Sequence, residues 1–257
     1  MQILTQVLPW LLLFFASVMA GALNGVAGGG SFITFPALIF VGLPPINANA
    51  TNNTGTWVGY LSSFYAYRQD LEVRSQELWR LILISLAGGI FGSVLLLNTP
   101  QSVFAKLVPY LLLLATTFFA LNPWLKRLQS RRGALPSKRM LLLLGVLQWM
   151  VAIYGGYFGG GVGILLLALF GLMGMEDIHA MNRLKTLLST CINGIAMVIF
   201  IASGTVLWTH AILMSMGTIL GGYWGVYYVR KVDPTLVRWF VIAVGLGMTL
   251  YFFVKTS

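Results

Sequence analysis

The sequence predicts an all-α polytopic membrane protein made of two related halves, and two observations lead to this prediction. Hydrophobic residues make up 58% of the 257-residue chain and charged residues 9%, with a mean hydropathy of +0.85. A soluble core of this size could not bury so much apolar surface, so much of it must face lipid. Glycine triplets also interrupt hydrophobic sequence at residues 28–30 and 159–161, one in each half.

Ten hydrophobic segments follow one another along the chain. Two of them, 31–43 and 162–174, are short, and each comes directly after a glycine triplet. At 1.5 Å per residue, a helix of this length covers about 20 Å of a hydrocarbon core that is about 30 Å thick. We therefore expect two half-helices. The other eight segments are long enough to span a bilayer, or nearly so: 3–26, 52–67, 79–98, 103–125, 139–157, 182–203, 209–229 and 235–254.

The basic residues predict the topology. The net charge is +10, but the Lys and Arg residues stand at the ends of hydrophobic segments, which is typical of membrane topology and not of nucleic-acid binding. If every segment, short ones included, changes the side of the membrane, 14 of the 16 Lys and Arg residues lie in the cytoplasm and both termini lie outside. If the short segments return to the side they came from, this bias weakens. The first segment has no Lys or Arg before it, so we expect a retained helix and not a cleaved signal.

The second half repeats the order of the first. The triplet recurs at an offset of 131, Ala50-Thr51-Asn52 recurs as Ala180-Met181-Asn182 at an offset of 130, and the glycine pattern of residues 88–92 recurs at 221–225. Because each half contains five segments, the second half should enter the membrane inverted. The expected organisation is a first repeat over 1–125, a basic cytoplasmic linker over 126–139 and an inverted repeat over 140–257. Paired glycine-interrupted segments of this kind indicate a transporter's binding site.

The triplets are candidate substrate-binding elements. The amino terminus of a half-helix presents free N–H donors and a positive dipole end, and glycine lets a ligand approach the backbone closely. With the halves inverted, both triplets would meet near the midplane and form a site for a small anion. The alternative is close helix packing, which we prefer for Gly88, Gly89, Gly92, Gly221, Gly222 and Gly225. The candidate residues are Gly28, Gly29, Gly30, Ser31, Gly159, Gly160 and Gly161.

A polar stretch follows each half-helix. Asn47 and Asp177 are expected to cap the helices that start there. Asn49, Asn52 and Asn53 have helical spacing, so their amides lie on one face and could offer uncharged donors to an oxyanion. The alternative is simple solvation at the interface.

In the second stretch, Asn182, Arg183 and Lys185 are further candidates. A basic residue here could neutralise an anion entering from the cytoplasm, or it could anchor the helix at the interface. Glu176, Asp177 and His179 could carry a coupled proton, although a solvated loop is the simpler interpretation.

No catalytic residue, metal ligand or cofactor site is expected. The single cysteine, Cys191, rules out an internal disulfide and a multi-cysteine metal site, and it is expected to be a small buried hydrophobe. The sequence contains no HExxH, GxSxG, Walker A or paired intramembrane aspartate motif, so an enzyme is not predicted.

The ordered motifs resemble the TauE/SafE family of membrane permeases, the sulfite exporter family. The resemblance covers nearly the whole chain and rests on the stretch from Gly21 through Asn24 and the first triplet to Pro36, on Gly42 to Thr51, on Asn182 to Ser189 and on Leu220 to Gly225. It implies a permease of the bacterial inner membrane that exports sulfite or small organosulfur anions.

The sequence thus predicts a secondary transporter that moves a small anion by alternating access across a lipid bilayer, with a possible coupling proton. An anion channel, a permease for another small organic or inorganic anion, and a membrane subunit that scaffolds a partner are the alternatives.

Overall fold

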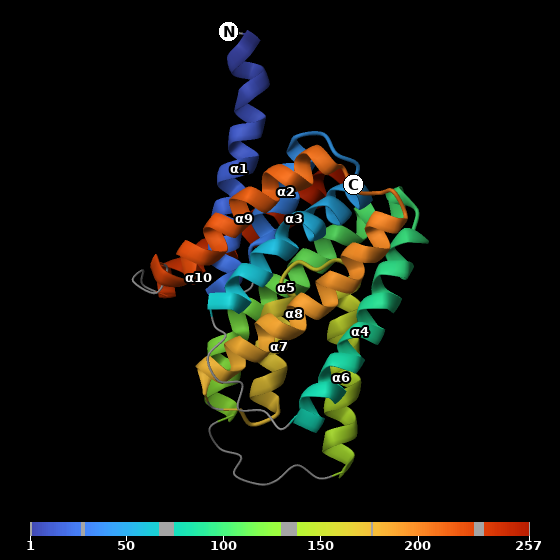
Figure 1. The fold of residues 1–257 in the computed structure, drawn as a ribbon, viewed down its shortest axis with the longest axis vertical. Coiled ribbons are helices and arrows are strands. Elements are labelled where there is room, and N and C mark those ends of the chain that lie inside the picture. Colours follow the sequence, from blue (N-terminus) through green and yellow to red (C-terminus); the bar gives the residue numbers. More distant parts are fainter. Residues whose placement is uncertain are drawn as a thin grey trace.

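The computed structural model describes residues 2–26, 29–66, 75–129, 138–175, 177–228 and 234–256. All regular structure in these ranges is helical, and the expected segments are all present (Figure 1). The polar stretches form the first turns of α3 and α8, so these helices begin earlier than expected. The helices are α1 Gln2–Val26, α2 Ser31–Phe40, α3 Pro45–Ala66, α4 Ser75–Leu97, α5 Gln101–Gln129, α6 Lys138–Tyr157, α7 Val162–Leu172, α8 Ile178–Ala202, α9 Trp208–Tyr228 and α10 Pro234–Thr256.

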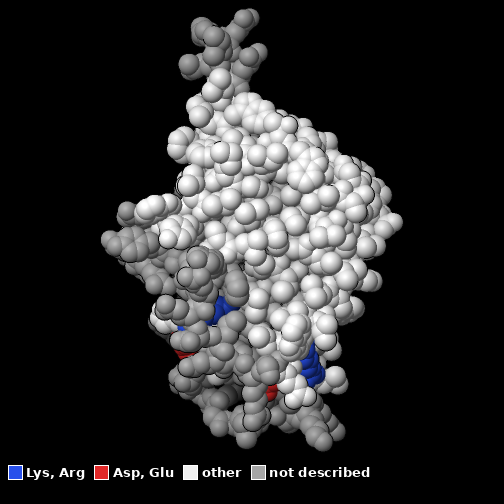
Figure 2. All heavy atoms as spheres, in the orientation of Figure 1, with Lys and Arg blue, Asp and Glu red and all other residues white. Residues whose placement is uncertain are grey.

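The outer surface suits lipid. Four stretches of the described residues are long and apolar enough to cross a membrane: Val7–Asn24, Gln76–Leu97, Gln101–Phe118 and His179–Ala202. Shorter apolar stretches include the half-helices α2 and α7. Large hydrophobic side chains are exposed along most of the helices. In Figure 2 the visible charged atoms gather at the end of the molecule opposite the amino terminus, and the surface between is almost uncharged.

Helices α4 and α6 pack closely through glycines and run in the same direction. A Cβ atom on Gly88 would lie 2.9 Å from the carbonyl oxygen of Trp149, and one on Gly92 would lie 2.1 Å from the carbonyl oxygen of Ile153. Such distances leave no room for a side chain, so these glycines allow the two backbones to approach each other. The packing interpretation of the first glycine pattern is confirmed.

Helices α1 and α9 form the corresponding pair. A Cβ atom on Gly217 would lie 2.8 Å from the carbonyl oxygen of Phe14, and one on Gly221 would lie 1.9 Å from that of Val18. Residue numbers therefore increase in the same direction along both helices, so α1 and α9 are also parallel. In the second glycine pattern, Gly221 and Gly222 are thus confirmed as packing positions, since a Cβ on Gly222 would lie 2.8 Å from the carbonyl oxygen of Gly59 on α3.

Helices α3 and α8 run in opposite directions where they touch. Asn53 donates from Nδ2 to Oδ1 of Asn193 at 2.7 Å, and Trp57 donates from Nε1 to the carbonyl oxygen of Thr190 at 3.0 Å. Residue numbers thus decrease along α8 in the direction in which they increase along α3. Helices α5 and α10 are likewise antiparallel: the ring centroids of Tyr110 and Phe253 are 5.1 Å apart, and a Cβ on Gly245 would meet Thr116.

Three helix junctions meet at one end of the bundle through Asn47. Its Nδ2 donates to the carbonyl oxygen of Thr205 at 2.9 Å, and its Oδ1 accepts from Nε2 of Gln101 at 3.1 Å. Gln101 in turn accepts from the backbone N–H of Ile46 at 2.9 Å. The prediction that Asn47 caps α3 is wrong, because the helix begins at Pro45, which has no N–H to satisfy. The Asn47 side chain instead joins α3 to the junctions α4–α5 and α8–α9.

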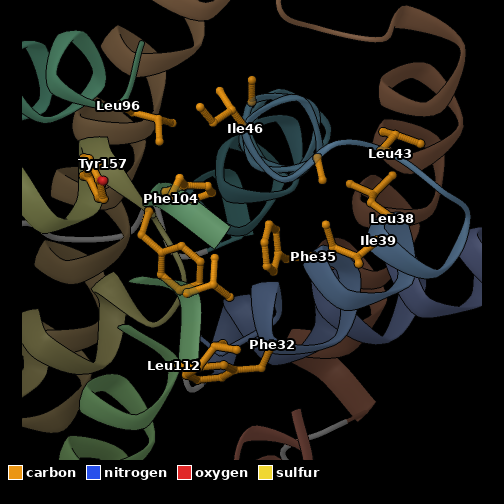
Figure 3. Packing of buried hydrophobic residues seen from close by; sticks show 14 of the residues in the cluster. Phe32, Phe35, Leu38, Ile39, Leu43, Ile46, Leu96, Phe104, Leu112 and Tyr157 are labelled. Carbon is orange, nitrogen blue, oxygen red and sulfur yellow. The ribbon is translucent and has the colours of Figure 1, made fainter. Parts of the chain in front are cut away.

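The half-helix α2 lies inside the main hydrophobic core. Its Phe32 and Phe35 are fully buried, and Figure 3 shows them near Phe104 and Leu112 of α5. The rings of Phe35 and Phe158 meet edge to face with centroids 5.5 Å apart. This burial explains how an interruption of the helix is tolerated in a membrane protein: α2 is enclosed by other parts of the protein.

Candidate functional site

The first helix break, between α1 and α2, is stabilised by a side chain of α1. Helix α1 ends at Val26 and α2 begins at Ser31; Gly28 lies outside the described residues. The N–H of Gly30 donates to Oδ1 of Asn24 at 2.8 Å, so one of the free donors expected at this half-helix is already satisfied. Gly30 has ordinary helical dihedrals, but a Cβ there would lie 2.2 Å from the carbonyl oxygen of Ala20. Glycine is needed here for space.

The second break needs glycine for a different reason. Gly159 and Gly161 adopt the left-handed conformation, with φ of 75° and 79°, which side chains disfavour. Between them, the carbonyl oxygen of Gly160 accepts from the hydroxyl of Tyr154 at 2.6 Å. A Cβ on Gly159 would lie 3.2 Å from Oδ1 of Asn193. The second triplet therefore turns the backbone toward the buried amides of α3 and α8.

The two breaks lie close together. A Cβ on Gly161, at the start of α7, would be 3.2 Å from Cζ of Phe32, in the first turn of α2. The ring contact between Phe35 and Phe158 joins the same two segments. The structure thus brings the two predicted site elements together across 131 residues of sequence.

The three asparagines of α3 are buried and each has a different partner. Asn49 donates from Nδ2 to the carbonyl oxygen of Tyr157, the last residue of α6, at 3.0 Å. Asn52 accepts through Oδ1 from the hydroxyl of Thr34 on α2. Asn53 bonds to α8, as described above. None is a solvated interfacial residue, because their exposed fractions are 1%, 2% and 4%. The amide face of α3 therefore contacts both breaks.

Lys185 is a fully buried basic residue, with an exposed fraction of 0%. Its Nζ donates to Oδ1 of Asn182 at 3.1 Å and to the carbonyl oxygen of Asn24 at 3.5 Å. No carboxylate of the described residues pairs with it. Burying an ammonium group without a counter-charge is costly, and a fully buried side chain is not an anchor that reaches the interface. Asn24 also has a buried Nδ2 donor without a hydrogen-bond partner in the described part of the chain.

Arg183 and Asp177 lie at the start of α8, where α8 is exposed. Arg183 is 3.9 Å from Asp177, and the Asp177 side chain is 55% exposed. Asp177 caps α8 as predicted, accepting from the backbone N–H groups of His179 and Ala180. The hydrogen bond from His179 lowers the pKa of the Asp177 carboxyl below its ordinary value, helped by the bond from Ala180 and the charge of Arg183. Asp177 and Arg183 thus lie at an exposed helix start; Glu176 lies outside the described residues.

The sequence identified Lys185 as a candidate but not three further polar residues that are buried in the structure. They are Asn24 on α1 and Ser189 and Asn193 on α8. The spacing of Asn182, Lys185, Ser189 and Asn193 places one polar stripe along a helix that is otherwise apolar. In the sequence, this three-to-four-residue spacing could have identified Ser189 and Asn193. The position of Asn24, an amide shortly before a glycine triplet, could have identified that residue.

Comparison with known proteins gives the family. The sequence profile of the family described as "Sulfite exporter TauE/SafE" matches residues 13–252. The chain belongs to the TauE/SafE family. The match spans both breaks and both halves, as the resemblance of the motifs implied. No solved structure matches the chain significantly.

Relatives within the TauE/SafE family are named as membrane transporters. The chain is 30% identical over 240 residues to a "Probable membrane transporter protein" of Haemophilus influenzae, covering 93% of this chain and 92% of the relative. It is 30% identical over 251 residues to the "Probable membrane transporter protein YfcA" of Escherichia coli, covering 96% and 91%. A relative from Sinorhizobium with a similar name is 28% identical, covering 93% and 90%. With its apolar helices, the chain is a multi-pass membrane protein of a transporter family.

Proposed function

We propose that the protein is a secondary transporter of the bacterial inner membrane that exports a small sulfur oxyanion, sulfite or a related organosulfur anion. The observation that carries this proposal is the buried ammonium group of Lys185, which no carboxylate of the described residues neutralises. A small anion would supply the missing counter-charge. The family description supports sulfite as the first anion to test.

The surrounding groups also suit an anion. Nδ2 of Asn24 is a buried donor without a partner in the described residues, and it belongs to the residue whose carbonyl oxygen Lys185 contacts. Helix α2 begins seven residues after Asn24, at Ser31, and its amino terminus contributes a positive dipole end. Asn182 completes the set, since its Oδ1 holds the Lys185 ammonium. Positive charge and donors thus gather at the first break.

The directions of the helices support an inverted repeat with ten alternating segments. If α2 and α7 returned to the side from which they entered, α3 and α8 would run in the same direction. The α2–α3 and α8–α9 junctions would then lie on opposite sides of the membrane. Instead, α3 and α8 are antiparallel, and Asn47 bonds to Thr205 across those two junctions. Two inverted halves that meet at their breaks can rock against each other, which is the geometry of alternating access.

The decisive experiment is radiolabelled sulfite flux in proteoliposomes, with Lys185→Gln and Arg183→Gln beside the parent. Both substitutions remove one positive charge from α8, but only the first removes the buried one. Lys185→Gln should lower the apparent affinity for sulfite by about tenfold or more, because a buried charge-assisted contact contributes about 1.5–3 kcal/mol. Arg183→Gln should change it much less. Equal flux in parent and Lys185→Gln would refute the site, and large unitary currents in planar bilayers would show a channel instead.

A further inference from the structure

The two helix breaks differ in the side chain that contacts the carboxyl end of the preceding helix. At the first, α1 ends at Val26, and the ammonium of Lys185 lies 3.5 Å from the carbonyl oxygen of Asn24 in the last turn. The carboxyl end of a helix carries partial negative charge, which offsets part of the cost of burying this cation but does not replace a counter-ion. At the second, α6 ends at Tyr157, and the carbonyl oxygen of Tyr157 accepts from an uncharged amide, Nδ2 of Asn49. The second break lacks the built-in cation of the first among the described residues.

The orientations of the amides at the second break follow from their partners. Backbone carbonyl oxygens can only accept hydrogen bonds, so the donor Nδ2 of Asn49 must face Tyr157 and the donor Nδ2 of Asn193 must face Ser189. Oδ1 of Asn193 is then the acceptor for Nδ2 of Asn53, at 2.7 Å. Consequently Oδ1 of Asn49 and Oδ1 of Asn53 point elsewhere. Both are buried acceptors without a hydrogen-bond partner in the part of the chain that the structure describes.

We propose that Oδ1 of Asn49 and Oδ1 of Asn53 bind a sodium ion at the carboxyl end of α6. The two residues are one helical turn apart on the same face of α3, with exposed fractions of 1% and 4%. Amide and carbonyl oxygens are hard ligands, and the helix end adds negative potential. Neutral ligands suit a monovalent ion, because Ca²⁺ and Mg²⁺ sites are built with carboxylates. The described residues contain no group of three His, Cys, Asp or Glu side chains that could hold a metal.

The sodium site is separate from the anion site. Lys185 and Asn193 are eight residues apart on α8, which corresponds to about 12 Å along the helix. The Lys185 ammonium points back toward Asn182 and so away from Asn193. One small oxyanion cannot contact both places. The coupling role of sodium rests on the proposed function: the ion would bring to the second break the positive charge that Lys185 supplies at the first.

Binding is tested on the purified protein in detergent by measuring Tm against NaCl, with choline chloride holding the ionic strength constant and with KCl and LiCl as comparisons. The parent should show a saturable, sodium-selective rise in Tm. Asn49→Leu and Asn53→Leu should each weaken the apparent sodium affinity by about tenfold or more. Gln148→Leu is the matched control, since Gln148 is also a buried amide with an unpartnered oxygen, but it bonds to Ser85 between α6 and α4.

A variant that should bind sodium more tightly distinguishes loss of the site from misfolding, because a misfolded protein would not gain affinity. Asn53→Asp replaces a neutral oxygen ligand with a carboxylate, so sodium should bind more tightly and the affinity should fall as the pH is lowered. A parent without any sodium-selective rise in Tm would overturn the proposal, as would an Asn53→Asp variant with unchanged sodium affinity. A rise that depends on pH but not on sodium would also overturn it.

Flux measurements separate this proposal from the proposed function. Sulfite flux is compared in proteoliposomes with and without a sodium gradient. If sulfite moves equally in sodium and choline, the coupling role is wrong while the anion transporter stands. If sodium binds to the parent and no sulfur anion moves, the proposed function is wrong while the sodium site stands.

Discussion

The ammonium of Lys185 lies 3.5 Å from the backbone carbonyl oxygen of Asn24, a residue 161 positions earlier in the chain. This contact joins the polar stripe of α8 to the end of α1, immediately before the first glycine triplet. It places the buried cation beside a break that the chain must protect from lipid. Movement of this break would therefore change the surroundings of the buried side chain.

In the variant Asn24→Asp, the new carboxylate should compete with the substrate anion for the ammonium group of Lys185. The variant keeps an oxygen that can accept from the N–H of Gly30, and it adds a carboxylate on the residue that Lys185 contacts. A tethered counter-ion should lower the apparent affinity for sulfite by about tenfold or more while Tm holds or rises. Sulfite-dependent Tm shifts of the purified variant measure this. An unchanged affinity would mean that Lys185 does not bind the anion.

Gly30→Ala should destabilise the protein strongly. The new Cβ would lie 2.2 Å from the carbonyl oxygen of Ala20, which is backbone and cannot move aside cheaply. A cost of about 3 kcal/mol is expected from such overpacking. Gly247→Ala on α10 is the matched control, since nothing lies within 4 Å of its new Cβ, and it should be neutral or slightly stabilising. Thermal unfolding in detergent compares the two, and equal Tm values would contradict the close approach.

Impermeant maleimide labelling tests the alternating topology. In a Cys191→Ala background, single cysteines replace the exposed residues Glu77, Asn98 and Ser203. Asn98→Cys and Ser203→Cys should react in intact cells, because both lie near the junctions that Asn47 joins. Glu77→Cys should react only after permeabilisation. If Asn98→Cys and Ser203→Cys react from opposite sides, the half-helices do not change the side of the chain.

Loss of the Asp177 cap should destabilise α8 in a pH-dependent way. The hydrogen bond from His179 lowers the folded-state pKa of Asp177. The carboxylate therefore contributes stability above its ordinary pKa, and this contribution disappears as the pH falls through the lowered value. Asp177→Ala should lower Tm at neutral pH, and the difference from the parent should shrink in acid. Asp177→Asn should retain most of the capping without that pH dependence. A difference for Asp177→Ala that does not vary with pH would contradict the assignment.

The sequence predicted the fold well because hydrophobic length and glycine placement are local signals. All ten segments appear as helices in the described residues, and the two short ones follow the triplets. The prediction for Asp177 is confirmed because a cap depends on two or three neighbouring residues. The same reasoning failed for Asn47, where Pro45 starts the helix and the side chain serves residues far away in the sequence.

By itself, the sequence determined that the chain lies in a membrane, that its helical structure is interrupted at two glycine triplets, and that a polar stretch follows each half-helix. Composition and spacing are sufficient for these conclusions. Only the tertiary structure decided which basic residue is buried: Arg183 and Lys185 are two positions apart, so they face different sides of α8, one toward Asp177 and one toward Asn24. It also decided that the two triplets need glycine for different reasons. Burial and partners across more than a hundred residues depend on packing, which local sequence does not encode.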